Sequence, residues 1–125
     1  MKTKREIILE NILEQAKAYL TELHEFAPFG SAINLDGEIK PLGVYIDEEE
    51  IDSLKMIEML QNHILRMIND NKFIIGAIAI DITVNASGNS YNAVEVRFIE
   101  NESQYKKQIK YQIKENIVMF EEIDY

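Results

Sequence analysis

The stretch Phe73-Ile-Ile-Gly-Ala-Ile-Ala-Ile-Asp-Ile-Thr-Val84 decides the fold of this chain. It is rich in β-branched residues, almost wholly apolar, and carries a single charge, Asp81. β-branched side chains favour strands because they pack well on a pleated surface. The stretch therefore predicts a strand inside a sheet, with one isolated carboxylate.

Two amphipathic helices are predicted before this strand. Across residues 4–25, apolar side chains recur every three to four positions, which is the spacing of one helix face. Pro28 ends this helix, because the residue before a proline avoids the α conformation. A second apolar stripe predicts a helix over about residues 49–70, preceded by four carboxylates that can cap its start. The predicted buried stripe of the first helix is Ile8, Ile12, Ala16, Tyr19 and Leu23, widened by Leu9, Leu13 and Leu20.

The segment between the helices has the pattern of a β-hairpin around Asp36-Gly37. A two-residue turn would set Ile33 against Lys40. A three-residue loop that ends with Gly37 in the left-handed conformation sets Ile33 against Ile39 instead. We favour the longer loop, because it keeps the apolar side chains on one face of the hairpin.

After residues 73–84, three further strands are predicted, separated by turns near residues 85–90, 100–103 and 115–116. A register that sets Val84 against Val94 leaves one face of the first two strands apolar. The same register sets Asp81 against Arg97, and cross-strand pairs of this kind contribute about 0.2–1 kcal/mol. We therefore predict a structural ion pair between Asp81 and Arg97.

The predicted order of elements is α-β-β-α-β-β-β-β. Short hairpin loops imply antiparallel neighbours, and alternating apolar and polar residues imply one covered sheet face. The predicted fold class is α+β: a two-layer sandwich in which both helices cover one face of an antiparallel sheet of about six strands. At 125 residues, the chain is expected to form a single domain over residues 1–125.

Composition excludes several classes of function. The chain has no cysteine, so disulfides, thiolate metal sites and cysteine nucleophiles are ruled out. A net charge of −9 argues against general nucleic-acid binding. The charge favours solubility, which is a sufficient explanation for it, and it would also steer the protein toward basic partners. Because no signal peptide and no apolar run of about 20 residues is visible, we expect a cytoplasmic protein without a membrane segment.

No catalytic constellation, metal site or cofactor motif is recognisable in the sequence. His24 and His63 lack partners at metal-ligand spacing, and the glycines match neither phosphate-binding pattern. Asp81 could be a buried acid, but a structural role beside Arg97 is the interpretation we favour. The candidate binding residues are therefore aromatic and acidic side chains suited to protein contact. They are Phe26, Phe29, Tyr45, Asp47, Glu48, Glu49 and Glu50.

Several motifs occur in the order found in a group of small bacterial proteins. Residues 26–32 read F-A-P-F-G-S-A, residues 35–39 read L-D-G-E-I, and residues 92–97 read N-A-V-E-V-R. Together with the acidic residue at Asp81, this order resembles small α+β bacterial proteins, some of which are similar to immunity proteins of toxin systems. The resemblance implies a small, acidic, cytoplasmic and non-catalytic protein, and it transfers no active-site residue.

Two functions are compatible with these observations. The first is a non-enzymatic interaction protein that binds a basic partner surface, as an immunity-type inhibitor would. The alternative is a small-ligand-binding or enzymatic domain, with a site near the first hairpin and the strand pair Asp81 and Glu95. A homodimer is compatible with both, and it is expected if residues 73–84 form a sheet edge that needs a partner strand.

Overall fold

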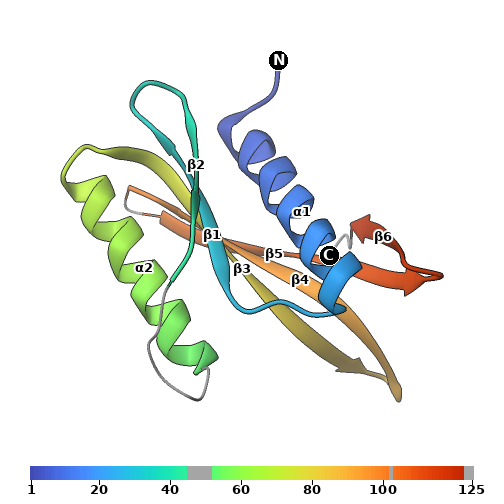
Figure 1. The fold of residues 1–125 in the computed structure, drawn as a ribbon. Coiled ribbons are helices and arrows are strands. Elements are labelled where there is room, and N and C mark those ends of the chain that lie inside the picture. Colours follow the sequence, from blue (N-terminus) through green and yellow to red (C-terminus); the bar gives the residue numbers. More distant parts are fainter. Residues whose placement is uncertain (45–51, 102, 123–125) are drawn as a thin grey trace.

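The computed structural model describes residues 1–44, 52–101 and 103–122. In this part of the chain two helices and six strands follow one another in the predicted order (Figure 1). The strands form one antiparallel sheet in the order β2-β1-β3-β4-β5-β6, which confirms the α+β class. The elements are α1 (Lys4–Leu23), β1 (Phe29–Asn34), β2 (Ile39–Leu42), α2 (Ser53–Asn69), β3 (Phe73–Ala86), β4 (Asn89–Glu100), β5 (Ser103–Lys114) and β6 (Ile117–Glu122).

Both helices begin at a side chain that caps the first turn. Thr3 Oγ1 accepts a hydrogen bond from the Glu6 N–H over 3.1 Å, and the Asp52 carboxylate accepts one from the Lys55 N–H over 3.2 Å. Such caps satisfy N–H groups that have no partner within the helix. Asp52 places the start of α2 at Ser53, later than the predicted start near residue 49. The carboxylates predicted to cap it, at positions 47–50, lie outside the described residues.

The β1–β2 hairpin has the three-residue loop that the apolar register favours. Ile33 lies opposite Ile39, and the Asn34 N–H donates to the Glu38 carbonyl over 3.0 Å. Gly37 has a φ of 84°, a conformation that is strained for residues with a side chain. The predicted loop and its register are therefore confirmed.

The two helices lie on opposite faces of the sheet (Figure 1). Successive residues of a strand point to opposite faces. In β3, Ile75, Ala77 and Ala79 belong to the hydrophobic cluster of α1, whereas Ile78 and Ile80 belong to that of α2. The predicted placement of both helices on one face is therefore wrong, because β3 is apolar on both of its faces and each face has its own helix.

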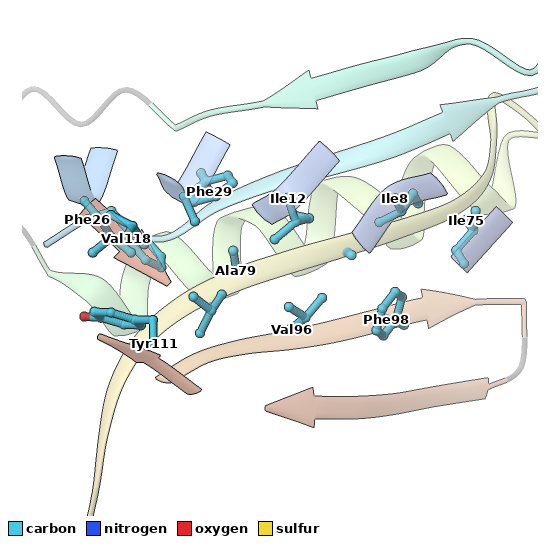
Figure 2. Packing of buried hydrophobic residues seen from close by; sticks show 14 of the residues in the cluster. Ile8, Ile12, Phe26, Phe29, Ile75, Ala79, Val96, Phe98, Tyr111 and Val118 are labelled. Carbon is cyan, nitrogen blue, oxygen red and sulfur yellow. The ribbon is translucent and has the colours of Figure 1, made fainter. Parts of the chain in front are cut away.

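The helix α1 packs on the sheet through one residue per turn. Figure 2 shows Ile8 and Ile12 facing side chains of β3 and β4. The stripe advances by four residues, so it ends at Leu20, and the predicted stripe members Tyr19 and Leu23 are exposed instead. Complete burial of one such aliphatic side chain contributes about 1.5–3 kcal/mol. The buried residues of α1 are Ile8, Ile12, Ala16 and Leu20.

The β3–β4 register differs from the predicted one because the turn between the strands is short. Ser87 and Gly88 have φ values of 51° and 79°, so a two-residue turn pairs Ala86 with Asn89. The prediction treated residues 85–90 as a longer turn, which shifted the pairing by three positions. An odd shift exchanges the two faces of a strand. Asp81 therefore lies opposite Val94 and not opposite Arg97.

Ion pairs and hydrogen bonds hold both ends of α1 on the sheet. At its start, the Arg5 guanidinium binds both carboxylate oxygens of Glu100 at 2.9 and 3.1 Å and lies over the Tyr105 ring. This contact lowers the pKa of the Glu100 carboxyl. At its end, His24 Nε2 lies 3.2 Å from Asn116 Oδ1 in the β5–β6 turn. The helix thus spans the curled part of the sheet from β4 to β6.

The interior position of β3 bears on the predicted dimer. β3 pairs with β1 on one side and with β4 on the other. The backbone groups of residues 75–79 therefore need no partner strand from a second chain. Beyond Ala79 the strand pairs with β4 alone, and the homodimer stays a prediction. The strands at the two edges of the sheet are β2 and β6.

Gly76 offers a direct test of the packing of α2 on β3. A Cβ added there would lie 2.5 Å from Ile64 Cγ2, a contact that real side chains do not make. We predict that Gly76→Ala lowers the free energy of unfolding by about 1–3 kcal/mol, as overpacking does. Urea unfolding followed by circular dichroism measures the change.

Gly43→Ala is the matched control, because a Cβ at that position meets no atom within 4 Å. Adding Ile64→Ala to Gly76→Ala removes the clashing methyl group, so the double variant should lose less stability than the two single changes added together. Equal tolerance of alanine at Gly76 and Gly43 would show that α2 does not pack here.

Candidate functional site

Asp81 is held by two hydrogen bonds within the fold. The Tyr111 hydroxyl donates to Asp81 Oδ1 over 2.6 Å, and the Phe26 N–H donates to Oδ2 over 3.3 Å. Tyr111 comes from β5 and Phe26 from the connection between α1 and β1, so Asp81 ties three parts of the chain together. The predicted ion pair between Asp81 and Arg97 is therefore wrong, and we name the observed arrangement the Asp81 latch.

The latch has a defined electrostatic character. Burial raises the pKa of Asp81 above its usual range, although the hydrogen bonds from Tyr111 and Phe26 act in the opposite direction, and the negative charge of Glu25 adds to the increase. Burial, together with the bond to Asp81, also raises the pKa of Tyr111, which therefore remains a hydrogen-bond donor. Both oxygens of the carboxylate are occupied by groups of the protein itself, so the latch serves structure.

Glu95 is a further enclosed carboxylate, and it lies on the opposite face of the sheet. It is 6% exposed, although most glutamates lie at the surface. Arg97 Nε donates to Glu95 Oε2 over 2.9 Å, and Gln108 and Lys106 approach Oε1 at 3.5 and 4.0 Å. Because Asp81 and Glu95 face opposite sides of the sheet, the predicted site that combined them does not assemble.

The predicted aromatic contact residues are part of the core. Phe26 and Phe29 are buried, and their rings meet edge to face with centroids 5.3 Å apart (Figure 2). Tyr19 meets the Phe29 ring in the same way from α1. The two phenylalanines therefore hold the α1–β1 connection in place and are not available to a partner. The remaining predicted binding residues, Tyr45, Asp47, Glu48, Glu49 and Glu50, lie outside the described residues.

An exposed apolar and acidic surface lies where α1 ends beside the β5–β6 turn. Leu23 is 65% exposed and Ile117 is 60% exposed. His24 directly follows Leu23, and Asn116 directly precedes Ile117. The contact between His24 and Asn116 therefore brings the helix end and the turn together. We call this the α1-end surface. It consists of Glu22, Leu23, Glu25, Glu115 and Ile117.

The α1-end surface was missed in the sequence because Leu23 fits a helical apolar stripe when steps of three and four residues are both allowed. A stripe that advances by four throughout, from Ile8 to Leu20, leaves Leu23 outside it. Exposed apolar side chains that gather at one place and are rimmed by charged residues are typical of contact sites.

A concave region, which we call the β2–α2 groove, lies between the end of β2 and α2. It has a volume of about 310 Å³. Leu42 and Val44 pack against the cluster of α2 from one side, and Leu60 belongs to that cluster. At the rim, Arg66 Nη2 lies 3.3 Å from His63 Nδ1, and the His63 ring meets Phe73 edge to face. The groove is lined by Leu42, Gly43, Val44, Met59, Leu60, His63 and Arg66.

The described parts of the chain contain neither a cluster of metal-ligand side chains nor a helix that could span a membrane. Across residues 1–44, 52–101 and 103–122, no group of three or more histidine or acidic side chains converges as a metal site. Neither α1 nor α2 has the length and apolar character that crossing a membrane requires.

Comparison with known proteins found no match among family models, curated proteins or solved structures. A fold by itself does not imply a function. The function of this chain must therefore follow from the surfaces and the charges described above.

The raised pKa of Asp81 predicts how stability depends on pH. Because the folded state holds this proton more tightly than the unfolded chain does, the contribution of Asp81 falls as the pH rises from the ordinary aspartate value through the raised one. Asp81→Asn cannot ionise, and its amide can still bond to Tyr111 and Phe26. We therefore predict that the variant gains stability relative to the wild type as the pH rises through this window.

Urea unfolding at a series of pH values between about 3 and 7 tests this expectation. Asp36→Asn, at an exposed loop position, is the matched control for the change of side chain. If the free energy of unfolding of Asp81→Asn instead falls relative to that of the wild type as the pH rises, the account of the latch is contradicted.

Proposed function

We propose that this protein is a non-enzymatic interaction protein that binds a basic protein partner, with the α1-end surface as its contact site. The observation that carries the proposal is the pair of exposed apolar side chains, Leu23 and Ile117, flanked by carboxylates. Exposed apolar anchors supply binding energy when a partner desolvates them. The surrounding charges select the partner and speed its approach.

The charge of the whole chain supports a basic partner. The sequence has 22 acidic and 13 basic residues. Glu22, Glu25 and Glu115 have no ion-pair partner within the described residues, so their charges face solvent at this end of the molecule. An uncompensated acidic surface attracts lysine- and arginine-rich proteins over about 8 Å at physiological salt.

The immunity-type inhibitor that the sequence motifs resemble is one form that such a protein can take. It would bind and mask a basic surface of a toxin in the cytoplasm. In that form the inhibitor needs no catalytic group, since masking depends only on surface complementarity and charge.

Affinity capture from the source cell tests the proposal. Tagged wild-type protein is expected to retain a basic protein at physiological salt, and the retained protein is identified and purified for binding measurements. The double variant Glu22→Lys and Glu25→Lys should then weaken binding at least about tenfold, with most of the loss in the association rate and less of it at high salt.

The double variant Glu14→Lys and Glu58→Lys is the matched control, since it makes the same change of net charge at exposed positions elsewhere on the helices. Equal weakening by both double variants would contradict the assigned surface. Capture of no basic protein, even at low salt, would contradict the proposed function.

A further inference from the structure

The β2–α2 groove combines an apolar interior with one cationic edge. Leu42, Val44 and Leu60 form its inner wall, and all three pack in or against the hydrophobic cluster of α2. Met59 extends the apolar lining toward solvent, where it is exposed. Ligand sites have this composition in general: mostly apolar walls with a few polar groups that orient the ligand.

Arg66 supplies the charge at the groove. The chain has three arginines, and two of them are bonded to carboxylates, Arg5 to Glu100 and Arg97 to Glu95. Arg66 instead lies against the ring nitrogen of His63, and no carboxylate pairs with it in the described part of the chain. Arginine has five N–H donors, so most of its guanidinium group is available to an anion after this contact.

His63 fixes the direction of that guanidinium. Its Nδ1 accepts from Arg66 Nη2, because arginine can only donate. The ring itself is held edge to face against Phe73, with centroids 5.9 Å apart, and Phe73 is buried. The cation is thus oriented by a side chain that is itself anchored in the core, as a preorganised binding group is.

The size of the groove limits the ligand. A volume of about 310 Å³ lies at the lower end of the range for ligand pockets. At about 30 Å³ for each water-sized group, it holds about ten non-hydrogen atoms. An unbranched carboxylate of eight carbons has that size, with its chain against the leucines and its carboxylate at Arg66.

We propose that the β2–α2 groove binds a small amphipathic carboxylate, with an apolar body of medium-chain length and its anionic group on Arg66. Leu42, Val44, Met59 and Leu60 form the site for the apolar body, and His63 is a positioning residue for Arg66. This site is separate from the α1-end surface, and its test does not depend on the proposed protein partner.

Titration with octanoate, followed by NMR of the backbone amides, tests the proposal. We expect saturable binding with shifts centred on residues 42–44 and 59–66. Octanol has the same apolar chain without the charge, and acetate has the charge without the chain, so each should bind at least about tenfold more weakly than octanoate. Octanol that binds as well as octanoate would remove the role of Arg66 and overturn the proposal.

Variants separate the two parts of the site. Arg66→Gln should weaken octanoate about tenfold and leave octanol unchanged. Met59→Asp should abolish binding of both probes, because it adds a negative charge to the apolar wall. Leu54→Asp, on the same helix but outside the groove and exposed, is the matched control and should bind octanoate normally.

All three positions are partly or wholly exposed, and an unchanged amide spectrum without ligand shows that a variant is folded. If Met59→Asp does not fold, Arg66→Gln still shows whether octanoate binding depends on the guanidinium group. Absence of saturable octanoate binding to the wild type, or equal binding to the wild type and Arg66→Gln, would overturn the proposal.

Discussion

Burial of β3 on both of its faces is the constraint on which the rest of this structure depends. A strand that is apolar on both faces needs cover on both, and α1 and α2 provide it from opposite sides. The same strand also needs neighbours at both edges, and β1 and β4 provide those. Once these four elements surround β3, β2 is left at one edge of the sheet, and β5 and β6 extend the other until they curl toward α1. At the α1-end surface and the β2–α2 groove, some apolar side chains remain exposed, among them Leu23, Ile117 and Met59.

Much of the fold could be predicted from the sequence, because periodicity and turn residues report local structure. The apolar pattern located both helices and the long strand. Asp36-Gly37 located the hairpin, and the requirement for one apolar face selected its correct register. The placement of α2 could not be predicted in the same way. The alternation in the later strands suggested one covered face, while the continuous apolar run in β3 required two. The predicted partner of Asp81 was wrong because of the turn between β3 and β4. Ser87 adopts a positive φ, which is unusual for a residue other than glycine, and this makes the turn shorter than predicted. The observed register differs from the predicted one by three positions, so Asp81 shares a sheet face with Tyr111 and not with Arg97.

The candidate site was less predictable than the fold, because residue type does not report burial. Phe26 and Phe29 look like contact residues in the sequence, yet they fill the space under the α1–β1 connection. Leu23 looks like a core residue and lies at the surface. The groove could not be recognised from the sequence, because Leu42 and Arg66 are far apart in the chain and line the same groove only in the folded structure. The sequence did identify the acidic character of the protein, which is a property of composition and remains the basis for expecting a basic partner.

The central claim is that β3 is enclosed on all sides, with helices on its faces and β1 and β4 at its edges. Native-state hydrogen exchange on the amides of β3 tests this enclosure most directly. Residues 75–79 pair with β1 on one side and β4 on the other, so successive N–H groups are bonded alternately to the two neighbours. The account predicts that every amide from 75 to 79 exchanges only through global unfolding. From residue 81 onward the strand pairs with β4 alone, and every second amide should exchange faster. Fast exchange of alternate amides within residues 75–79 would mean that β3 is an edge strand, and it would contradict the account.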